Sequence, residues 1–301
     1  MELRQLRYVE AVAAHRHFTR AAAAIGIAQP ALSHQIKRLE QELGIELFHR
    51  SRGGVRLTAA GETLLPRVRR ALSELEAGRE EVVALTGLQT GRLRLGAMQA
   101  PGPLDLPRAI ARFHRAHPAV EVTLSEESTL RMQHLVLDGQ LDLAIVALEV
   151  GYPDSLGALA LVEEPVLLAL PHDHRLAGGA SIQIGQLRDQ PFVFFRAGTG
   201  LRTTIERIGR EAGFTPQMAF ETGNLDRLLA LVHEGLGVSV IPASTARDGK
   251  PRVTALPFSP PLTRTVGVVW RADRALPPAA RVMRELLVRC VGKTDEGELV
   301  R

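Results

Sequence analysis

The chain has 301 residues, 45% hydrophobic and 23% charged, which is enough for two or three domains with packed cores. No stretch approaches the roughly 18 consecutive apolar residues of a membrane span, and the N-terminus lacks the features of an export signal. The single cysteine, Cys290, excludes a disulfide within the chain. We therefore expect a soluble, cytoplasmic protein with no membrane partner, in which Cys290 is either a small core residue, the commoner role, or a reactive thiol.

The formal net charge of +4 is concentrated near the N-terminus. Residues 1–58 hold nine Lys or Arg against five Asp or Glu, with four of the ten histidines, whereas the charges of the remainder balance. A basic module on a neutral body favours an anionic partner. Nucleic acid fits better than a membrane surface, because no apolar amphipathic face accompanies the positive charge.

Apolar spacing predicts three helices in this basic module. The apolar stripe of the first helix is formed by Leu3, Leu6, Val9 and Val12. A short second helix covers about 19–25, where small alanines allow close helix crossing, and Gly26 ends it in the left-handed conformation. Pro30 suits the first turn of a third helix. The buried face of that helix is expected to consist of Leu32, Ile36, Leu39 and Leu43.

The opposite face of the third helix carries hydrogen-bonding groups followed by cations. Its outward residues are Gln29, Pro30, Ser33, His34, Lys37 and Arg38. In a helix-turn-helix, the second helix is the recognition helix, and its first turns contact base edges in the major groove. Gln29 could pair with adenine, Ser33 with a base or a phosphate, and Lys37 with phosphate, as could Arg38. The alternative is a polar face that is merely solvated.

A β-hairpin is predicted over residues 46–62, with Gly53 and Gly54 at its turn. The arginines around this turn are Arg50, Arg52 and Arg56. Beside a helix-turn-helix, such a hairpin resembles a wing, whose arginines would follow a narrow minor groove or neutralise phosphates.

These elements together resemble the N-terminal winged helix-turn-helix of LysR-type transcriptional regulators, most diagnostically in AQPALSHQIKRLEQELGIELFHR. The resemblance implies that the DNA is lined by Gln29, Pro30, Ser33, His34 and Lys37, with Arg50 and Arg52 in the wing. Two positions depart from the family pattern. His34 stands where members often carry arginine, which makes contact there weaker or dependent on pH. His17 replaces a serine that commonly caps the second helix.

A linker helix is predicted over residues 59–90 from alternating spacings of four and three. The expected dimerisation seam consists of Leu64, Val68, Ala71, Leu75, Val82 and Leu85, with Gly78 between Leu75 and Val82. The alternative is a helix that lies on its own chain. The resemblance implies that this helix dimerises, that homodimers assemble further into homotetramers, and that paired recognition helices read two-fold operators.

Residues 91–301 alternate strands and helices, which predicts βαβ units with parallel sheets in an α/β domain. Two Rossmann-like subdomains are expected: subdomain I from about 91–161 and 266–301, and subdomain II from about 162–265. A hinged pair of this kind has a cleft outside its strand ends, where small molecules bind.

The segments GQLDLAIV, LLALPHDHRLA and LALVHEGLGVSVIPAS are similar to the effector-binding domain of the same family, which itself resembles periplasmic binding proteins. By this resemblance, the effector-binding residues are Gln99, Ala100, Pro101, Ser128, Thr129, Thr199, Gly200, Leu201, Arg202 and Asn224. Free amides at helix starts favour an anion. Arg202 could hold a carboxylate through two hydrogen bonds, which suggests an organic acid, although it could equally be a surface residue. Ala100 lacks the hydroxyl that many members carry there.

Together these features predict a sequence-specific DNA-binding transcriptional regulator whose activity is modulated by a small molecule in the cleft. Its partners would be double-stranded operator DNA, the effector and, for an activator, RNA polymerase. No cofactor or metal is expected, since a metal role for His172, His174 and Asp189 is not favoured. A rival hypothesis, a catalytic α/β domain tethered to DNA, lacks a catalytic constellation, so we expect no enzyme. A second rival, a structural DNA-coating protein without a ligand, would differ in that no metabolite shifts its thermal stability with concentration.

Overall fold

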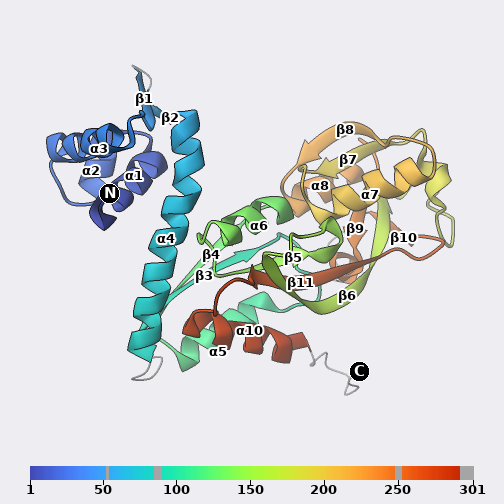
Figure 1. The fold of residues 1–301 in the computed structure, drawn as a ribbon. Helices are drawn as coiled ribbons and strands as arrows, with labels where there is room; N and C mark the ends of the chain where they lie inside the picture. Colours follow the sequence, from blue (N-terminus) through green and yellow to red (C-terminus); the bar gives the residue numbers. More distant parts are fainter. Residues whose placement is uncertain (52–53, 85–89, 248–252, 292–301) are drawn as a thin grey trace. The chain divides into compact units, whose positions relative to one another are not determined.

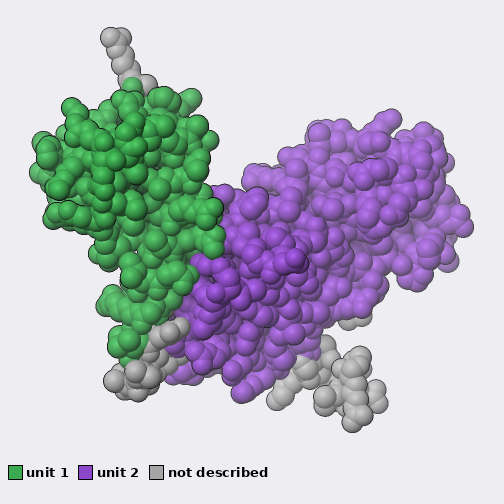
Figure 2. Space-filling view, in the orientation of Figure 1, with its two compact units in different colours: residues 1–83, 138–140 green, residues 84–137, 141–301 purple. Residues whose placement is uncertain are grey.

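The computed structural model describes residues 1–51, 54–84, 90–247 and 253–291 (Figure 1). The chain divides into two compact units, coloured separately in Figure 2. Unit 1 comprises Met1–Val83 and Asp138–Gln140, and unit 2 comprises Ala84–Leu137 and Leu141–Arg301. Each unit is described below by itself.

Unit 1 begins with the three predicted helices, α1 (Leu3–His15), α2 (Phe18–Ala24) and α3 (Gln29–Leu43). Their shared core contains Val9, Val12, Ala21, Leu32, Ile36 and Leu39, none with any exposed surface. Gly26 has a φ of +69°, and the neighbouring Ile27 amide donates to the Ala22 carbonyl at 3.0 Å. The predicted left-handed turn between α2 and α3 is therefore confirmed, and the alanines let these helices approach closely.

Two residues predicted to be buried are exposed, one at the start of α1 and one at the end of α3. Leu3 is 42% exposed and Leu43 is 41% exposed. At the start of α1 it is Gln5 that is buried, where its side-chain oxygen accepts a hydrogen bond from the Glu2 amide at 2.8 Å. This bond caps the N-terminus of α1. Hydrophobic spacing does not predict which polar residue forms such a cap. Leu43 is the last residue of α3 and precedes the left-handed Gly44, so no further turn covers it.

The predicted hairpin consists of β1 (Phe48–Ser51) paired antiparallel with β2 (Gly54–Leu57). Helix α4 (Ala59–Ala84) follows, and the Thr58 hydroxyl oxygen caps its start by accepting from the Gly61 amide at 3.0 Å. Gly61 is required here, because a Cβ at that position would lie 2.2 Å from the Leu47 carbonyl oxygen. The hairpin and the first turns of α4 are thus held against one another.

The expected dimerisation seam along α4 needs a correction at Val68. This side chain is 2% exposed and packs into the core of unit 1, together with the neighbouring Leu65. Val68 therefore packs within its own chain, as in the alternative prediction of a helix that lies on its own chain. Leu64 is half-buried, and Leu85 lies outside the described residues. The seam residues exposed on α4 are Ala71, Leu75 and Val82.

Unit 2 is built on strands whose hydrogen-bonded order is β10-β6-β11-β5-β3-β4, with β9 also paired to β6 and a separate β7-β8 pair. The strands are β3 (Gly91–Ala97), β4 (Val120–Glu126), β5 (Leu143–Ala147), β6 (Leu156–Leu170), β7 (Pro191–Phe195), β8 (Gln217–Thr222), β9 (Ser239–Pro242), β10 (Thr254–Pro257) and β11 (Thr263–Arg271). The sequence did not predict β10.

The parallel arrangement predicted for this domain is only partly right. Strand β3 is parallel to β4 and to β5, and β7 is parallel to β8. The long strand β6, however, pairs antiparallel with β11 through its first part and with β9 and β10 through its last part. Two long antiparallel strands therefore connect the halves, and the predicted boundaries at 161/162 and 265/266 fall inside them. Alternating hydrophobicity does not reveal that one strand belongs to two sheets.

Helices cover the strands of each half. The helices of unit 2 are α5 (Leu106–Ala116), α6 (Thr129–Leu137), α7 (Gly200–Glu211), α8 (Leu225–His233), α9 (Ala243–Arg247) and α10 (Pro278–Val291), with short 3-10 helices η1 (Leu148–Val150) and η2 (Ile184–Leu187). Helices α5 and α10 lie side by side in the first half and share a core that includes Phe113 (Figure 1). Helix α6 packs in a second core with Val146, and α7 and α8 enclose Phe192.

Candidate nucleic-acid interface and ligand pocket

The outward face of α3 is arranged as the sequence predicts. Pro30, His34, Lys37 and Arg38 are exposed, whereas Leu32, Ile36 and Leu39 are buried. Gln29 and Ser33 are half-buried neighbours, and the Gln29 side-chain amide donates to the Ser33 hydroxyl oxygen at 2.7 Å. One face of the helix therefore presents a pre-oriented amide and hydroxyl followed by two cations. The free amides at the start of α3, where Ala28 provides no side-chain cap, add positive potential.

The hairpin, predicted as a wing, supplies a further cation next to the start of α2. The Arg50 guanidinium lies 4.3 Å from the centroid of the Phe18 ring, a cation–π contact that restricts where the side chain can point. Phe18 is in turn packed edge-to-face against Phe48 at 6.1 Å between ring centroids. Arg56 is exposed on β2, and Arg52 lies outside the described residues. Arg50 thus belongs to β1 of the hairpin and contacts the start of α2.

The departure at His17 has a structural answer. His17 is the N-cap of α2, and its Nδ1 accepts a hydrogen bond from the Thr19 amide at 3.2 Å. An unprotonated ring nitrogen therefore fills the role of the serine hydroxyl oxygen, and α2 keeps its cap.

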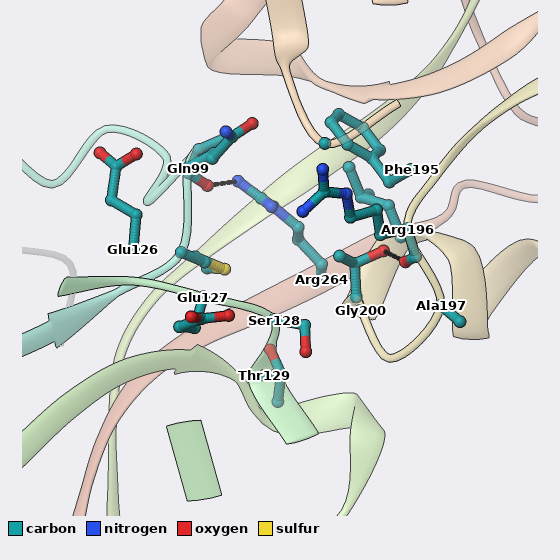
Figure 3. Close-up of a pocket in the computed structure, with 15 residues that line it drawn as sticks. Gln99, Glu126, Glu127, Ser128, Thr129, Phe195, Arg196, Ala197, Gly200 and Arg264 are labelled. Carbon is teal, nitrogen blue, oxygen red and sulfur yellow. Dashed lines mark hydrogen bonds between the residues drawn. The ribbon is translucent and has the colours of Figure 1, made fainter. Parts of the chain in front are cut away.

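A pocket of about 180 Å³ lies in unit 2 between the carboxyl ends of strands and the starts of helices (Figure 3). The predicted effector residues that line it are Gln99, Ala100, Ser128, Thr129, Thr199, Gly200 and Leu201. The further lining residues, which the sequence did not suggest, are Met98, Glu126, Glu127, Phe195, Arg196, Ala197, Gly223 and Arg264. Arg196 and Glu127 each follow a strand directly, and this position at a strand end was a usable indication.

Pro101, Arg202 and Asn224 are not among the lining residues, which corrects the expectation for them. The Arg202 guanidinium donates to Glu206 at 2.8 Å and also to Glu221, and it lies 5.2 Å from the centroid of the Phe194 ring. The hydrogen bond to Glu206 raises the pKa of Arg202 above its ordinary value, and its bond to Glu221 acts in the same direction. Arg202 therefore links α7 to β8. Asn224 caps α8 by accepting from the Arg227 amide at 2.8 Å.

Two helix starts open on the pocket. Helix α6 begins at Thr129, after Ser128, whose hydroxyl oxygen accepts from the Arg131 amide at 3.4 Å. Helix α7 begins at Gly200 and has no side-chain hydrogen bond at its cap, Thr199. Unpaired amides and aligned peptide dipoles favour a bound anion at such positions.

The wall of the pocket includes a buried ion pair. Arg264, on β11, donates through Nε to the Glu164 carboxylate at 2.9 Å, and both residues are 4% exposed. The same guanidinium donates to the Ala100 carbonyl at 2.6 Å, drawn as a dashed line in Figure 3. Glu164 also accepts from the Ser244 amide at 3.2 Å. The pair therefore connects β6 and β11 to the loop after β3 and to the start of α9.

Glu149, in η1, lies close to β11, which also carries Arg264. Burial raises the pKa of the Glu149 carboxyl above its ordinary value, although hydrogen bonds, including one from the Thr265 amide, oppose this effect. Glu149 thus ties η1 to β11 in a partly desolvated setting.

Gly200 marks a close approach between the two halves of unit 2. A Cβ at this position would lie 2.3 Å from the Ala147 Cβ at the end of β5. We predict that Gly200→Ala lowers the free energy of unfolding by about 1–3 kcal/mol, because overpacking forces the start of α7 away from β5. Urea titration checks this. Gly185→Ala, which meets nothing within 4 Å, is the control. Equal stability of the two variants would contradict the contact.

The histidines considered for metal binding have other partners. His174 Nε2 lies 3.0 Å from the Gln190 side-chain oxygen, and His172 Nδ1 lies 2.9 Å from the Thr254 hydroxyl. Within the described ranges, no cluster of three His, Cys, Asp or Glu side chains could hold a metal ion. The same ranges contain no helix long and apolar enough to cross a membrane. Cys290 is half-buried and packs against the core beneath α10.

Comparison with known proteins gives matches over nearly the whole chain. Residues 3–62 match the family model described as bacterial regulatory helix-turn-helix protein, lysR family, and residues 86–290 match the LysR substrate binding domain. The HTH-type transcriptional regulator YnfL of Escherichia coli (strain K12) is 35% identical over 94% of this chain and 97% of its own length. The DNA-binding transcriptional dual regulator OxyR of the same organism is 33% identical over 92% of this chain and 91% of its own.

Among solved structures, a full-length OxyR variant from Pseudomonas aeruginosa has a TM-score of 0.74 and 31% identity, over 97% of this chain and 94% of its own. A winged helix-turn-helix followed by an α/β ligand-binding domain defines a DNA-binding transcriptional regulator that responds to an effector. The chain belongs to the LysR family of these regulators. Its relatives are regulators rather than enzymes, in agreement with the sequence-based expectation.

Proposed function

We propose that this regulator reads its operator through α3. Gln29 and Ser33 contact base edges, and Pro30 and His34 line the groove. Lys37, Arg38, Arg50 and Arg52 contact phosphates. The observation that carries this proposal is the division of α3 into a buried side and an outward polar side that begins at a free helix N-terminus.

We further propose that α4 pairs with α4 of a second copy through Ala71, Leu75 and Val82, so that two recognition helices face two half-sites. Leu75 is 56% exposed and Val82 is 67% exposed, so both apolar side chains are accessible to a second copy. Assembly of such dimers into tetramers, action in the cytoplasm and contact with RNA polymerase at activated promoters complete the proposal.

The effector is proposed to bind in the pocket of unit 2. Its size suits a small metabolite, since a cavity of about 150 Å³ already holds benzene. Binding would change how the two halves of unit 2 are held, and through the dimer alter DNA binding. Coupling of this kind typically amounts to ~1–3 kcal/mol and is reciprocal, so operator DNA must change effector affinity by the same factor.

Base-contacting and phosphate-contacting residues give different mutant behaviour. Gln29→Ala or Ser33→Ala is expected to cost roughly 1–3 kcal/mol at particular base positions. Lys37→Ala is expected to weaken all sequences alike and to reduce the salt slope by about one unit. Fluorescence anisotropy with DNA from upstream of the gene, over a range of salt concentrations, measures both effects.

The hydrogen bond between Gln29 and Ser33 adds a sharper expectation. Their effects on operator affinity are not additive, because either substitution removes the partner that orients the other side chain. Scrambled DNA is the control. Site preference that survives the loss of both side chains would show that another face of the module reads the operator.

A further inference from the structure

The charges that line the pocket are of both signs. Arg196 and Arg264 are the lining cations, and Glu126 and Glu127 are the lining carboxylates. Arg264 is already paired with the buried Glu164 through Nε and Nη2, and Nη2 also donates to the Ala100 carbonyl. Among the described residues, no hydrogen bond or ion pair engages the side chains of Arg196, Glu126 or Glu127. One cation and two carboxylates are therefore available to a ligand.

These free charges stand on different walls. Figure 3 shows Glu126 and Glu127 on one side of the pocket and Arg196 with Ala197 on the other. Arg196 follows β7, on the wall that continues to the start of α7, whereas Glu126 ends β4 and Glu127 follows it. Gly223 lies under the Arg196 side chain, and a Cβ there would come within 2.9 Å of Arg196 Nε. The absence of a side chain at position 223 thus gives the guanidinium its place at the pocket.

A simple organic acid suits only part of this surface. Its carboxylate would be attracted by Arg196 and by the amides at the start of α7, but the rest of the molecule would lie beside two carboxylates without satisfying either. A second negative charge on the ligand would be repelled there. A ligand with a cationic group opposite its carboxylate pairs with both walls. Like-charge repulsion of this kind selects against the wrong ligand as well as for the right one.

We propose that the effector is a zwitterion of amino-acid size, with its carboxylate at Arg196 and the start of α7 and its ammonium group at Glu126 and Glu127. This inference rests on the proposed function, because it assigns a ligand class to the same pocket. The volume of about 180 Å³ leaves room for a short side chain against Met98, Phe195 and Leu201. The proposal thus narrows the ligand class expected from the sequence, an organic acid, to an organic acid that also carries a positive charge.

The test is thermal denaturation of the full chain with each of the common L-amino acids. For every amino acid that stabilises it, the matching deaminated carboxylate and the decarboxylated amine are measured too. We expect stabilisation that grows with ligand concentration, as binding to the folded state requires. The zwitterion should bind at least about tenfold more tightly than either half-charged analogue.

Charge variants assign the two ends. Glu126→Gln with Glu127→Gln should weaken zwitterion binding about tenfold while leaving the deaminated carboxylate as strong or stronger. Arg196→Gln should weaken both carboxylate-bearing ligands. Glu121→Gln is the matched control, since Glu121 is exposed on β4 and does not line the pocket.

Deaminated carboxylates that bind as tightly as the amino acids would overturn the inference and leave an effector pocket of simpler chemistry. The absence of stabilisation by any amino acid would overturn it as well. Neither result touches the regulatory function, which the operator titration tests separately.

Discussion

Glu164→Leu is expected to lower the free energy of unfolding of unit 2 by about 3–5 kcal/mol, the usual cost of leaving one member of a buried ion pair alone. Arg264 would keep its charge in a site where it is 4% exposed, and its bond to the Ala100 carbonyl could not compensate for the lost carboxylate. The Ser244 amide would also lose its acceptor. Urea titration followed by circular dichroism measures the effect in the full chain.

Two further variants separate charge from packing. Glu164→Leu combined with Arg264→Met removes both charges, and we expect it to recover much of the lost stability, because neither ion is left unpaired. Glu163→Leu is the matched control: the neighbouring carboxylate is exposed and its loss should be nearly neutral. If the single Glu164 variant were as stable as this control, the pair would contribute nothing to the fold.

The same substitution bears on the pocket. Glu164 and Arg264 lie on the two strands that connect the halves of unit 2, and they hold the loop that contributes Gln99 and Ala100 to the pocket wall. The buried pair joins these two strands to one another and to the pocket wall, so its loss should loosen that wall. We therefore expect ligand binding to weaken along with stability in Glu164→Leu. In the double variant we expect stability to recover more than ligand binding, because Arg264→Met also removes a lining residue and its bond to the Ala100 carbonyl.

The basic module could be predicted closely because its physics is local. Helical spacing, a glycine that must be left-handed and a proline at a helix start each act within a few residues. The errors arose where a polar group met a local need that hydrophobicity does not report, as at Gln5, or where a seam residue had two possible partners, as at Val68. A spacing of four and three describes a dimer seam and a domain core equally well.

In unit 2 the sequence located the pocket but misassigned its charged residues. Arg202 looked available because it sits at the start of a helix, yet its true partners, Glu206 and Glu221, are fixed by one turn of α7 and by the parallel pairing of β7 with β8. Arg196 lies at the end of a strand and became significant only once the fold placed Glu126 and Glu127 opposite it. Ligand chemistry here depends on long-range pairing, which neither spacing nor composition records.

Ile36→Ala is expected to destabilise unit 1 by about 2–5 kcal/mol and to abolish operator binding. Ile36 has no exposed surface, and it lies between Leu32 and Leu39 on the side of α3 that packs into the core. A cavity there lets the helix rock or rotate. Since base contacts require placement within a fraction of an ångström, binding fails before the module unfolds.

Ile36→Val and Lys37→Ala are the controls for Ile36→Ala. The valine variant removes one methyl group and should cost about 0.5–1.5 kcal/mol with operator binding retained. Lys37→Ala should leave stability nearly unchanged but weaken binding to every sequence, because Lys37 is exposed and adjacent in the chain yet on the other face of the helix. Equal stability of Ile36→Ala and Lys37→Ala would mean that α3 has no buried side, and residues 29, 33 and 37 would then have no reason to face the DNA.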